Sequence, residues 1–521
     1  MTTRPFERPA PAALPASLRS RPELNVESID GTVLSPIVAH AFERAAALPV
    51  VTDAALDAAR RARSERFARV GVEAQGRPGV FEATLARPGR RVILEVKAAS
   101  PSRGLMRAEV DAAQYARVYG RFADAVSVLT EPKYFGGSFE RLAQFRVLTA
   151  KPLLAKDFIV SERQILAAYA AGADAVLLML SVLSHDGYAR LAHFATRLGL
   201  EILTEASTEP EVRHAAAAGA RVIGINNRNL RTLEVDLGRA PRLARLVPAG
   251  RVVVAESGCR THRDMGLAQA AAPQINAFLC GSALSEAPDL SRAVRELVFG
   301  RTKCCGITRL EDALEAARAG AVAVGIICAP RSKRFVPLER ALELTRAVRS
   351  AAEAEGLPLE LFAVTDAEDF ERIRAAAAGV FDFVQVHGDV ADLPAAPGAP
   401  RVVPAFGMGG LDPAGARALA RRIQALEEEG RIAGAVLDNS DARGSGGTGR
   451  AFDFSLMDAF TGVPNLFIAG GLTPENAFAA LSAGGFAAAG ADLNSGVESA
   501  PGVKSKALLQ AAFRALRAIP A

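Results

Sequence analysis

Cysteines are few in this sequence, and apolar residues never form a long uninterrupted run. No stretch of about 18 consecutive apolar residues is present, so we expect no membrane-spanning helix and no membrane partner. The five cysteines form neither a C-x-x-C zinc pattern nor a disulfide framework; they are Cys259, Cys280, Cys304, Cys305 and Cys328. Their small number fits a reducing compartment, and we predict a cytoplasmic protein.

An excess of one charge sign is also missing. The 62 lysines and arginines stand against 57 aspartates and glutamates, and no block of basic residues marks a nucleic-acid partner. The 521 residues are too many for one hydrophobic core, which predicts roughly two to four domains. Residues 1–30 are rich in proline, alanine and arginine and lack the apolar segment of a signal peptide, so we predict a disordered leader.

Short apolar runs recur, and a polar loop and a helix-like stretch follow each of them. The first series has eight runs, at residues 91–98, 124–131, 152–158, 173–180, 200–207, 221–229, 251–258 and 276–284. Alternating strands and helices predict a parallel sheet, and eight such units over about 200 residues predict a closed (β/α)8 barrel. Residues 32–68 look helical, so we expect an added helical element before the first strand.

The same pattern then starts again. Eight further runs lie at residues 301–308, 321–329, 359–365, 381–388, 401–406, 433–440, 465–472 and 485–496. We therefore predict an α/β protein of two consecutive (β/α)8 barrels, the first over residues 31–298 and the second over residues 299–521. Chemistry in such barrels lies at the carboxyl ends of the strands.

Charged and polar residues end several predicted strands of the first barrel. They are Glu95 and Lys97 on the first strand, Lys156 on the third, Glu205 on the fifth, and Asn226 and Arg228 on the sixth. An internal ion-pair network is the alternative interpretation. Four strands that end in this way favour one functional pocket instead, because buried ion pairs seldom repay their desolvation through stability.

Small residues follow the seventh and eighth strands of the first barrel. Ser257 and Gly258 lie in "ESG", and Gly281 and Ser282 lie in "CGS". Backbone N–H groups in such loops can approach an anion, which predicts a phosphate site. A phosphorylated substrate that also bears a carboxylate would account for both this site and the two lysines.

The second barrel carries a different set of reactive residues. Strand alternation places Lys303 and Cys305 of "KCCG" on one face and Cys304 on the other, so Cys304 is expected to pack as an inert side chain. Cys305 lies at the barrel mouth beside the lysine, which would favour its thiolate. His387 ends the fourth strand; we place it among the substrate-binding residues, although a scaffold role is as compatible with it as catalysis.

Glycine-rich loops follow the last two strands of the second barrel as well. "AGG" contains Gly470 and Gly471, and "ADLNSG" contains Asn494 and Ser495, which together predict a second phosphate site. Arg334 in "RSKRFV" is available to an anion, and Asp438 ends the sixth strand.

Longer motifs of the first barrel resemble indole-3-glycerol-phosphate synthase. "LEVKAASPSRG", "AVSVLTEPKYFGGSF", "LLAKDF", "LTEAS" and "GINNRNL" occur in the same order as in that family, within residues 32–298. The resemblance implies ring closure and decarboxylation of 1-(2-carboxyphenylamino)-1-deoxyribulose 5-phosphate to indole-3-glycerol phosphate. No metal and no organic cofactor is expected for it.

The resemblance also implies roles for the residues at the strand ends. Lys156 would be a general acid at the substrate carbonyl, and Glu205 would be a general base. Glu95 and Lys97 would bind and polarise the substrate, and the sequence leaves open which of the two lysines is the main acid. Further substrate-binding residues would be Ser100, at a mobile loop edge, Asn226 and Arg228 for hydroxyls and carboxylate, and Ser257, Gly258, Gly281 and Ser282 for phosphate.

The second barrel resembles phosphoribosylanthranilate isomerase over about residues 300–521, through "KCCGIT", "SKRFV", "VQVHG", "VLDNS", "IAGGL" and "DLNSGVES". The resemblance implies an Amadori rearrangement in which Asp438 protonates the furanose oxygen and Cys305 removes the proton from C2′. Arg334 would meet the anthranilate carboxylate, and phosphate would be bound by Gly470, Gly471, Asn494 and Ser495. The sequence departs from the family pattern at "VPAFGMGG" and "FDF", away from the acid and the base.

The implied product of the second barrel is the implied substrate of the first, so we predict two consecutive steps of tryptophan synthesis. The partners would be small phosphosugar–anthranilate molecules, and we expect a monomer. One alternative is a pair of histidine-pathway isomerases, but those use paired aspartates where this chain has Glu/Lys and Cys. Another is a synthase fused to a degenerate barrel, against which the intact Cys305 and Asp438 pair argues.

Overall fold

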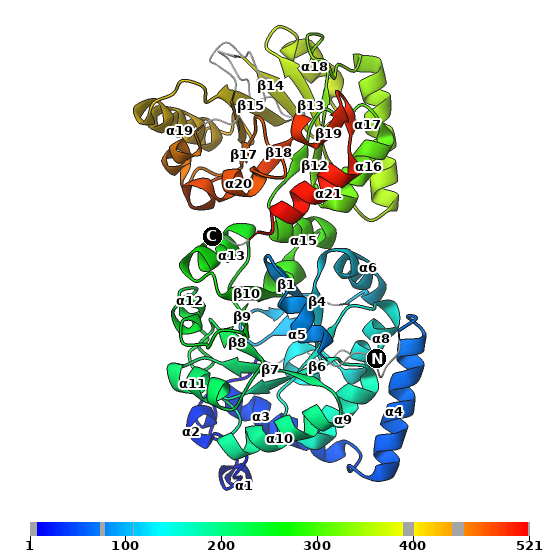
Figure 1. The fold of residues 1–521 in the computed structure, drawn as a ribbon, viewed down its shortest axis with the longest axis vertical. Helices are drawn as coiled ribbons and strands as arrows, with labels where there is room; N and C mark the ends of the chain where they lie inside the picture. Colours follow the sequence, from blue (N-terminus) through cyan, green and yellow to red (C-terminus); the bar gives the residue numbers. More distant parts are fainter. Residues whose placement is uncertain (1–7, 73–78, 108, 389–400, 440–452, 519–521) are drawn as a thin grey trace. The chain divides into compact units, whose positions relative to one another are not determined.

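The structure is a computed structural model that describes residues 8–72, 79–107, 109–388, 401–439 and 453–518. Two closed barrels of eight parallel strands follow one another along the chain (Figure 1). This confirms the predicted fold class. Among the described residues, no helix is long and apolar enough to cross a membrane.

The first barrel closes because its first strand pairs with both its second and its last strand. Its strands overlap the predicted runs one for one: β1 Arg91–Val96, β4 Ala125–Leu129, β5 Leu153–Lys156, β6 Ala175–Met179, β7 Glu201–Ala206, β8 Val222–Asn226, β9 Val252–Glu256 and β10 Ile275–Cys280. Most of these residues are buried and many are β-branched, as expected of parallel strands that are covered on both faces.

Helices connect the strands of this barrel. They are α6 Ala112–Phe122, α7 Pro132–Phe135, α8 Phe139–Leu148, α9 Glu162–Ala171, α10 His185–Arg197, α11 Glu209–Ala217, α12 Arg239–Ala244, α13 His262–Ala271 and α14 Ser282–Glu286. Two short ones, α7 and α14, contribute residues to the barrel mouth. The side chains of Ser138, Ser161, Ser184 and Thr208 cap four of these helices by accepting a backbone N–H. The loop after β1 forms a small hairpin of β2 Ala99–Ser100 and β3 Gly104–Leu105.

A helical region precedes β1, as the sequence predicted. It contains α1 Ala16–Arg19, α2 Val26–Ile29, α3 Leu34–Ala47, α4 Asp53–Ala68 and α5 Val80–Leu85. The predicted helical stretch is divided after Ala47, and a new helix begins where Thr52 caps the N–H of Ala55.

The prediction of a disordered leader over residues 1–30 is wrong for residues 8–30. Leu14 and Leu18 are buried, and the backbone N–H of Asn25 donates to the carbonyl of Val182 at 2.9 Å. The prediction rested on the average composition, which is rich in proline and alanine. It overlooked four apolar side chains that are buried in the structure, namely Leu14, Leu18, Leu24 and Ile29. Residues 1–7 lie outside the described part of the chain.

The strands of the second barrel also overlap the predicted runs. They are β11 Lys303–Cys304, β12 Ala323–Ile327, β13 Glu360–Asp366, β14 Phe383–His387, β15 Arg401–Gly407, β16 Ala435–Asp438, β17 Leu466–Ile468 and β18 Gly490–Leu493. Inside this barrel the rings of Phe362 and Phe383 stack with their centroids 4.5 Å apart. These aromatic side chains fill the interior, so the barrel is a packed core rather than a pore.

The helical elements of this second unit are α15 Leu290–Phe299, α16 Leu310–Ala319, α17 Leu338–Ala354, α18 Phe370–Ala377, α19 Pro413–Glu428, the 3₁₀ helix η1 Phe454–Phe460, α20 Ala477–Phe486 and α21 Lys506–Ala515. Helix α15 belongs largely to this unit, whereas the sequence-based boundary lay after residue 298. Its Arg295 donates to the backbone carbonyls of Ala321 and Pro358, at 2.5 and 2.6 Å. A short 3₁₀ turn and a hairpin of β19 Glu498–Ala500 and β20 Val503–Lys504 follow β18.

Candidate active sites

The predicted catalytic residues of the first barrel surround one cavity at the carboxyl ends of its strands. Its volume is about 1360 Å³, counted out to open solvent. All eleven predicted residues of this barrel line it: Glu95, Lys97, Ser100, Lys156, Glu205, Asn226, Arg228, Ser257, Gly258, Gly281 and Ser282. Ser100 lies in the hairpin after β1, where its hydroxyl accepts the N–H of Arg103.

Glu95 and Lys97 form an ion pair inside this cavity. The Nζ atom of Lys97 lies 2.5 Å from Oε1 of Glu95, and both residues are buried. Burial raises the pKa of Glu95, but the charges of Lys97 and Lys156 outweigh it and lower that pKa overall. Glu95 is therefore an ionised group whose charge holds Lys97 toward the pocket.

Lys156, at the end of β5, lies between two carboxylates. Its Nζ is 2.6 Å from Oε2 of Glu256 and 3.5 Å from Oε2 of Glu205. Burial would lower the pKa of Lys156, but the surrounding carboxylates raise it overall. Asn226 donates to Oε1 of Glu205 at 3.1 Å, which fixes the orientation of that carboxylate.

Glu256 is a charged residue of this cavity that the sequence did not assign to the site. It ends β9 and is fully buried in the pocket wall, although only the two residues after it were assigned. Burial raises the pKa of Glu256 to about 7, against the opposing effect of Lys156. A Cβ atom at Gly224 on the neighbouring β8 would lie 2.0 Å from its Oε1, so glycine there makes room for the carboxylate. The sequence did contain a signal for Glu256, because it lies at the end of a predicted strand, as the other charged residues of the site do.

The predicted phosphate-binding residues lie in two adjacent loops of this cavity. Ser257 and Gly258 follow β9 with φ values of +63° and +92°, in the left-handed region. A Cβ atom at Gly258 would contact Val235 at 2.5 Å, and one at Gly281 would lie 2.3 Å from Oε1 of Glu95. Both positions therefore need glycine, because a side chain there would collide with Val235 or with Glu95.

Apolar side chains also line this cavity. They include Leu34 and Ile37 of α3, together with Phe135 and Phe158. Such a surface can accommodate an aromatic ring beside the charged groups. Because α3 precedes the barrel, the N-terminal helical region supplies part of the pocket.

Lys303 and Cys305 face the same side of β11 in the second barrel, as strand alternation predicted. A Cβ atom at Gly325 would contact both the Sγ of Cys305 and the Cε of Lys303. The ammonium of Lys303 is fully buried and donates to Asp492 at 2.6 Å and to Gln385 at 2.9 Å.

The Cys305 thiol does not become more acidic beside that lysine. Burial raises the pKa of Cys305 overall, and Lys303 only partly offsets the effect, since its charge is matched by Asp492. The neighbouring Cys304 is completely buried, and burial raises its pKa to about 12, which agrees with an inert packing role.

His387 belongs to the same polar chain as Lys303. A lysine ammonium can only donate, so the carbonyl oxygen of Gln385 faces Lys303 and its amide nitrogen faces Nε2 of His387, 2.9 Å away. That nitrogen of His387 therefore accepts, and burial lowers the pKa of His387 to about 4. His387 is a neutral acceptor in this arrangement.

Asp438 lies at the end of β16, three strands from β11 around the closed barrel. A Cβ atom at Gly470 would lie 2.6 Å from Oδ1 of Asp438, so the glycine loop after β17 passes directly beside the predicted acid. Gly470 and Gly471 have φ values of +87° and +65°. Asn494 and Ser495 follow β18, the next strand in the barrel.

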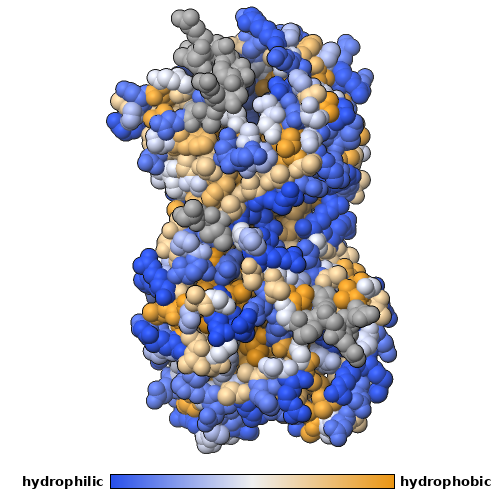
Figure 2. Space-filling view, viewed as in Figure 1, coloured by the Kyte–Doolittle hydropathy of each residue, from blue (hydrophilic) through white to orange (hydrophobic). Residues whose placement is uncertain are grey.

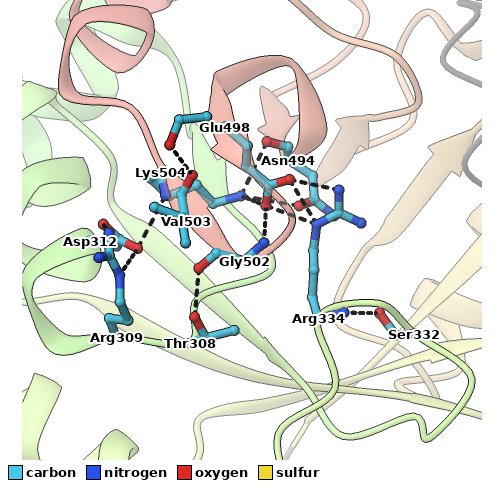
Figure 3. A network of polar contacts seen from close by, with 11 residues as sticks. Thr308, Arg309, Asp312, Ser332, Arg334, Asn494, Glu498, Gly502, Val503 and Lys504 are labelled. Carbon is cyan, nitrogen blue, oxygen red and sulfur yellow. Dashed lines mark hydrogen bonds and ion pairs between the residues drawn. The ribbon is translucent and has the colours of Figure 1, made fainter.

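Arg334 is held by a carboxylate of the protein itself (Figure 3). Its Nε and Nη2 atoms donate to the two carboxylate oxygens of Glu498, at 2.8 and 2.7 Å. A Cβ atom at Gly306, next to Cys305, would lie 2.6 Å from both Cδ of Arg334 and Oδ1 of Asn494. The structure thus brings Arg334 close to the predicted base and the predicted phosphate loop.

Two families of known proteins match the two halves of the chain. The family described as "Indole-3-glycerol phosphate synthase" matches residues 53–297, and the family described as "N-(5'phosphoribosyl)anthranilate (PRA) isomerase" matches residues 302–515. "Tryptophan biosynthesis protein TrpCF" of Vibrio cholerae is 42% identical over 446 residues, which are 84% of this chain and 88% of that protein. The chain belongs to the TrpCF family.

Other TrpCF proteins are similarly close. The one from Salmonella typhi is 37% identical and covers 90% of this chain and 98% of its own length. Among solved structures, phosphoribosyl anthranilate isomerase from Thermus thermophilus is 30% identical over 42% of this chain and 98% of that chain, with a TM-score of 0.32.

As a TrpCF protein, the chain is a bifunctional enzyme of tryptophan biosynthesis. Its second barrel isomerises N-(5-phosphoribosyl)anthranilate to 1-(2-carboxyphenylamino)-1-deoxyribulose 5-phosphate. Its first barrel closes and decarboxylates that product to indole-3-glycerol phosphate. The alternative of a degenerate second barrel is not favoured, because the isomerase family matches nearly all of that half of the chain.

Proposed function

We propose that Lys156 is the main general acid of the synthase reaction and Glu205 its general base. The observation that carries this proposal is the position of the Lys156 ammonium between Glu205 and Glu256 in the barrel cavity. A lysine whose pKa is raised by carboxylates stays protonated, which suits stabilisation of a developing alkoxide.

The reaction would start with attack of the aromatic carbon that bears the carboxylate on the substrate's ketone carbon. The carbonyl π electrons move to oxygen, and that oxygen takes a proton from Lys156. Loss of CO₂ leaves its bonding electrons in the ring and restores aromaticity. The alcohol then leaves as water after a second protonation, while Glu205 removes a proton from the adjacent carbon bonded to nitrogen.

The remaining residues of this pocket would bind the substrate. Lys97, held by Glu95, polarises the substrate and is a second candidate for the proton donor. Asn226 and Arg228 would hold its hydroxyls and carboxylate. The phosphate would accept backbone N–H groups of the loops that contain Ser257, Gly258, Gly281 and Ser282.

For the isomerase reaction, we propose Asp438 as the acid and Cys305 as the base. Asp438 would give a proton to the furanose oxygen, so the C1′–O bond breaks and the nitrogen lone pair forms a Schiff base. The Cys305 thiolate would then remove the C2′ proton, and the enolamine would tautomerise to the ketone. A raised thiol pKa means fewer thiolates at neutral pH, but each is a stronger base.

Arg334 would bind the anthranilate carboxylate, and Gly470, Gly471, Asn494 and Ser495 would surround the phosphate. His387 would accept a hydrogen bond and serve as scaffold. Each proposed site is built from residues of a single chain, which supports a monomeric enzyme, and light scattering tests this. The cysteines are few and all five are buried, which supports a cytoplasmic location.

Inactivation of each barrel separately tests these assignments. Cys305→Ala and Asp438→Ala should abolish consumption of phosphoribosylanthranilate and leave indole-glycerol phosphate formation nearly unchanged. Lys156→Ala and Glu205→Ala should do the reverse. Cys304→Ala is the matched control and should retain both activities. A Lys156 change that also stopped the isomerase would contradict two independent sites.

A further inference from the structure

Glu498 has an unusual set of donors for a carboxylate near a site that binds anions. Besides the two nitrogens of Arg334, it accepts from Nζ of Lys504 at 2.8 Å and from the backbone N–H of Gly502 at 3.2 Å. Its side chain is only 4% exposed, and that of Lys504 is completely buried. Figure 3 shows these groups converging on Glu498 from the β19–β20 hairpin and from the loop after β12.

Two roles are compatible with a carboxylate that binds a substrate-binding arginine. Glu498 could occupy the place of the substrate's carboxylate and be displaced by it. It could instead hold the guanidinium in place while another edge of Arg334 receives the substrate. Burial and the two additional donors favour the second role. Displacement of Glu498 would break its buried ion pair with Lys504, and two buried charges would then lack a partner.

The geometry of Arg334 agrees with the second role. Glu498 takes the Nε and Nη2 side of the guanidinium, and among the described residues none forms a hydrogen bond with Nη1. The side chain of Arg334 is 18% exposed, so this part of the molecule is not sealed. The stem of Arg334 passes Gly306, directly after Cys305, where a side chain would collide with it.

Lys504 connects this pair to the phosphate loop. Its Nζ donates to the backbone carbonyl and to the side-chain carbonyl of Asn494, both at 3.1 Å. The pKa of Glu498 is lowered, since Arg334 and Lys504 outweigh the opposing effect of burial, so the carboxylate is ionised. One fixed anion therefore lies between the arginine and the loop that would bind phosphate.

We propose that Glu498 is a positioning residue of the isomerase, which holds Arg334 ready for the anthranilate carboxylate and, through Lys504, at a fixed separation from the phosphate loop. Holding a long side chain before the substrate arrives removes an ordering cost from binding. The inference rests on the proposed role of Arg334 and assigns Glu498 no contact with the reacting atoms.

Steady-state kinetics of Glu498→Gln with two substrates test the proposal. One is phosphoribosylanthranilate, and the other is N-(5-phosphoribosyl)aniline, which has the same sugar and phosphate but no carboxylate. We expect the KM for the first to rise about tenfold, since a charge-assisted contact is lost, with kcat changed less than about twofold. The KM for the aniline compound should not change.

The matched control is Glu368→Gln. Glu368 binds Arg331 in the same loop as Arg334, at 2.9 Å, but both side chains are more than 70% exposed. Neither substrate should be affected by this change. Indole-glycerol phosphate formation by the same chain is the second control and should be normal in every variant.

The double variant Arg334→Ala, Glu498→Gln separates the possible outcomes. If Glu498 acts through Arg334, its change adds nothing to the KM of Arg334→Ala. A lower KM for Glu498→Gln, an equal loss on both substrates, or an additive loss in the double variant would each overturn the inference. If Arg334→Ala itself leaves the KM for phosphoribosylanthranilate unchanged, the proposed role of Arg334 fails; if only Glu498→Gln does so, the inference alone fails.

Discussion

The ammonium of Lys156 and the carboxylate of Glu256 lie 2.6 Å apart, although 100 residues separate them in the chain. They end strands β5 and β9 on different sides of the first barrel. Their side chains meet because the strands of a closed barrel surround one mouth, into which the side chains at their carboxyl ends point. Glu205 and Glu95 also act on the pKa of this lysine, so four charged side chains form one interacting group.

Glu256→Gln should slow the synthase about ten- to a hundredfold, because a charged partner of Lys156 is lost. The pKa of Glu256 is raised to about 7, so the carboxylate becomes ionised as the pH rises through 7 and then attracts Lys156 more strongly. The kcat/KM of the unaltered enzyme should therefore rise through this range, and the rise should be missing in the variant. Glu201→Gln is the control: burial also raises the pKa of Glu201 to about 7, but it binds the N–H groups of Phe81 and Glu82. The same pH profile in Glu256→Gln and the unaltered enzyme would contradict this prediction.

Gly224→Ala should impair the synthase by displacing Glu256, since the added Cβ would lie 2.0 Å from a carboxylate oxygen. Gly120→Ala is the matched change, in helix α6 with open space around the new methyl group. It should raise the free energy of unfolding by about 0.5–1 kcal/mol and keep full activity. Synthase kinetics and urea unfolding, followed by circular dichroism because the chain lacks tryptophan, measure both effects. Normal synthase kinetics for Gly224→Ala would argue against this account.

Asp492→Asn should destabilise the second barrel by about 3–5 kcal/mol, because the buried ammonium of Lys303 loses its counter-charge. Loss of isomerase activity with urea, measured beside synthase activity, would assign the destabilisation to this barrel. The double change Lys303→Met, Asp492→Leu should recover most of the stability, since no buried charge then remains. Equal urea sensitivity of Asp492→Asn and the unaltered enzyme would exclude an essential ion pair.

Arg44→Leu should lower synthase activity and leave the isomerase normal. Arg44 on helix α3 donates through two nitrogens to Asp157, at 3.0 and 2.6 Å, and Asp157 directly follows Lys156. Loss of this contact frees the strand end that carries the acid, so we expect a decrease in kcat/KM of about tenfold. Arg60→Leu on α4 is the control, because Arg60 and its partner Asp57 are both well exposed. Equal kinetics for the two variants would mean that α3 does not position Lys156.

The sequence by itself determined the two barrels and which strand ends carry the residues of each proposed site. Apolar runs at regular spacing fix strand count and order, and barrel closure then brings every strand end to one mouth, so Lys156 and Glu205 could be predicted to meet. Alternation along "KCCG" was enough to separate Cys305 from Cys304, because successive side chains of a strand point to opposite faces.

Only the tertiary structure decided which charges pair. The sequence could not show that Glu256 is the nearest partner of Lys156, that Asp492 neutralises Lys303, or that Glu498 holds Arg334. These pairs join strands and loops that are far apart in the chain, and their distances depend on how side chains pack around Gly224, Gly325 and Gly306. The pKa values of Glu256 and Cys305 follow from the same packing, because burial and the distances to neighbouring charges set them together.

Composition predicts average properties of the chain, such as its surface, but not the burial of individual residues. Hydrophilic side chains cover much of the face shown in Figure 2, as a mixed charge composition predicts. Composition also suggested disorder before residue 30, yet Leu14 and Leu18 are buried there. A few buried leucines outweigh a proline-rich average, since burial depends on where each side chain lies in the folded chain.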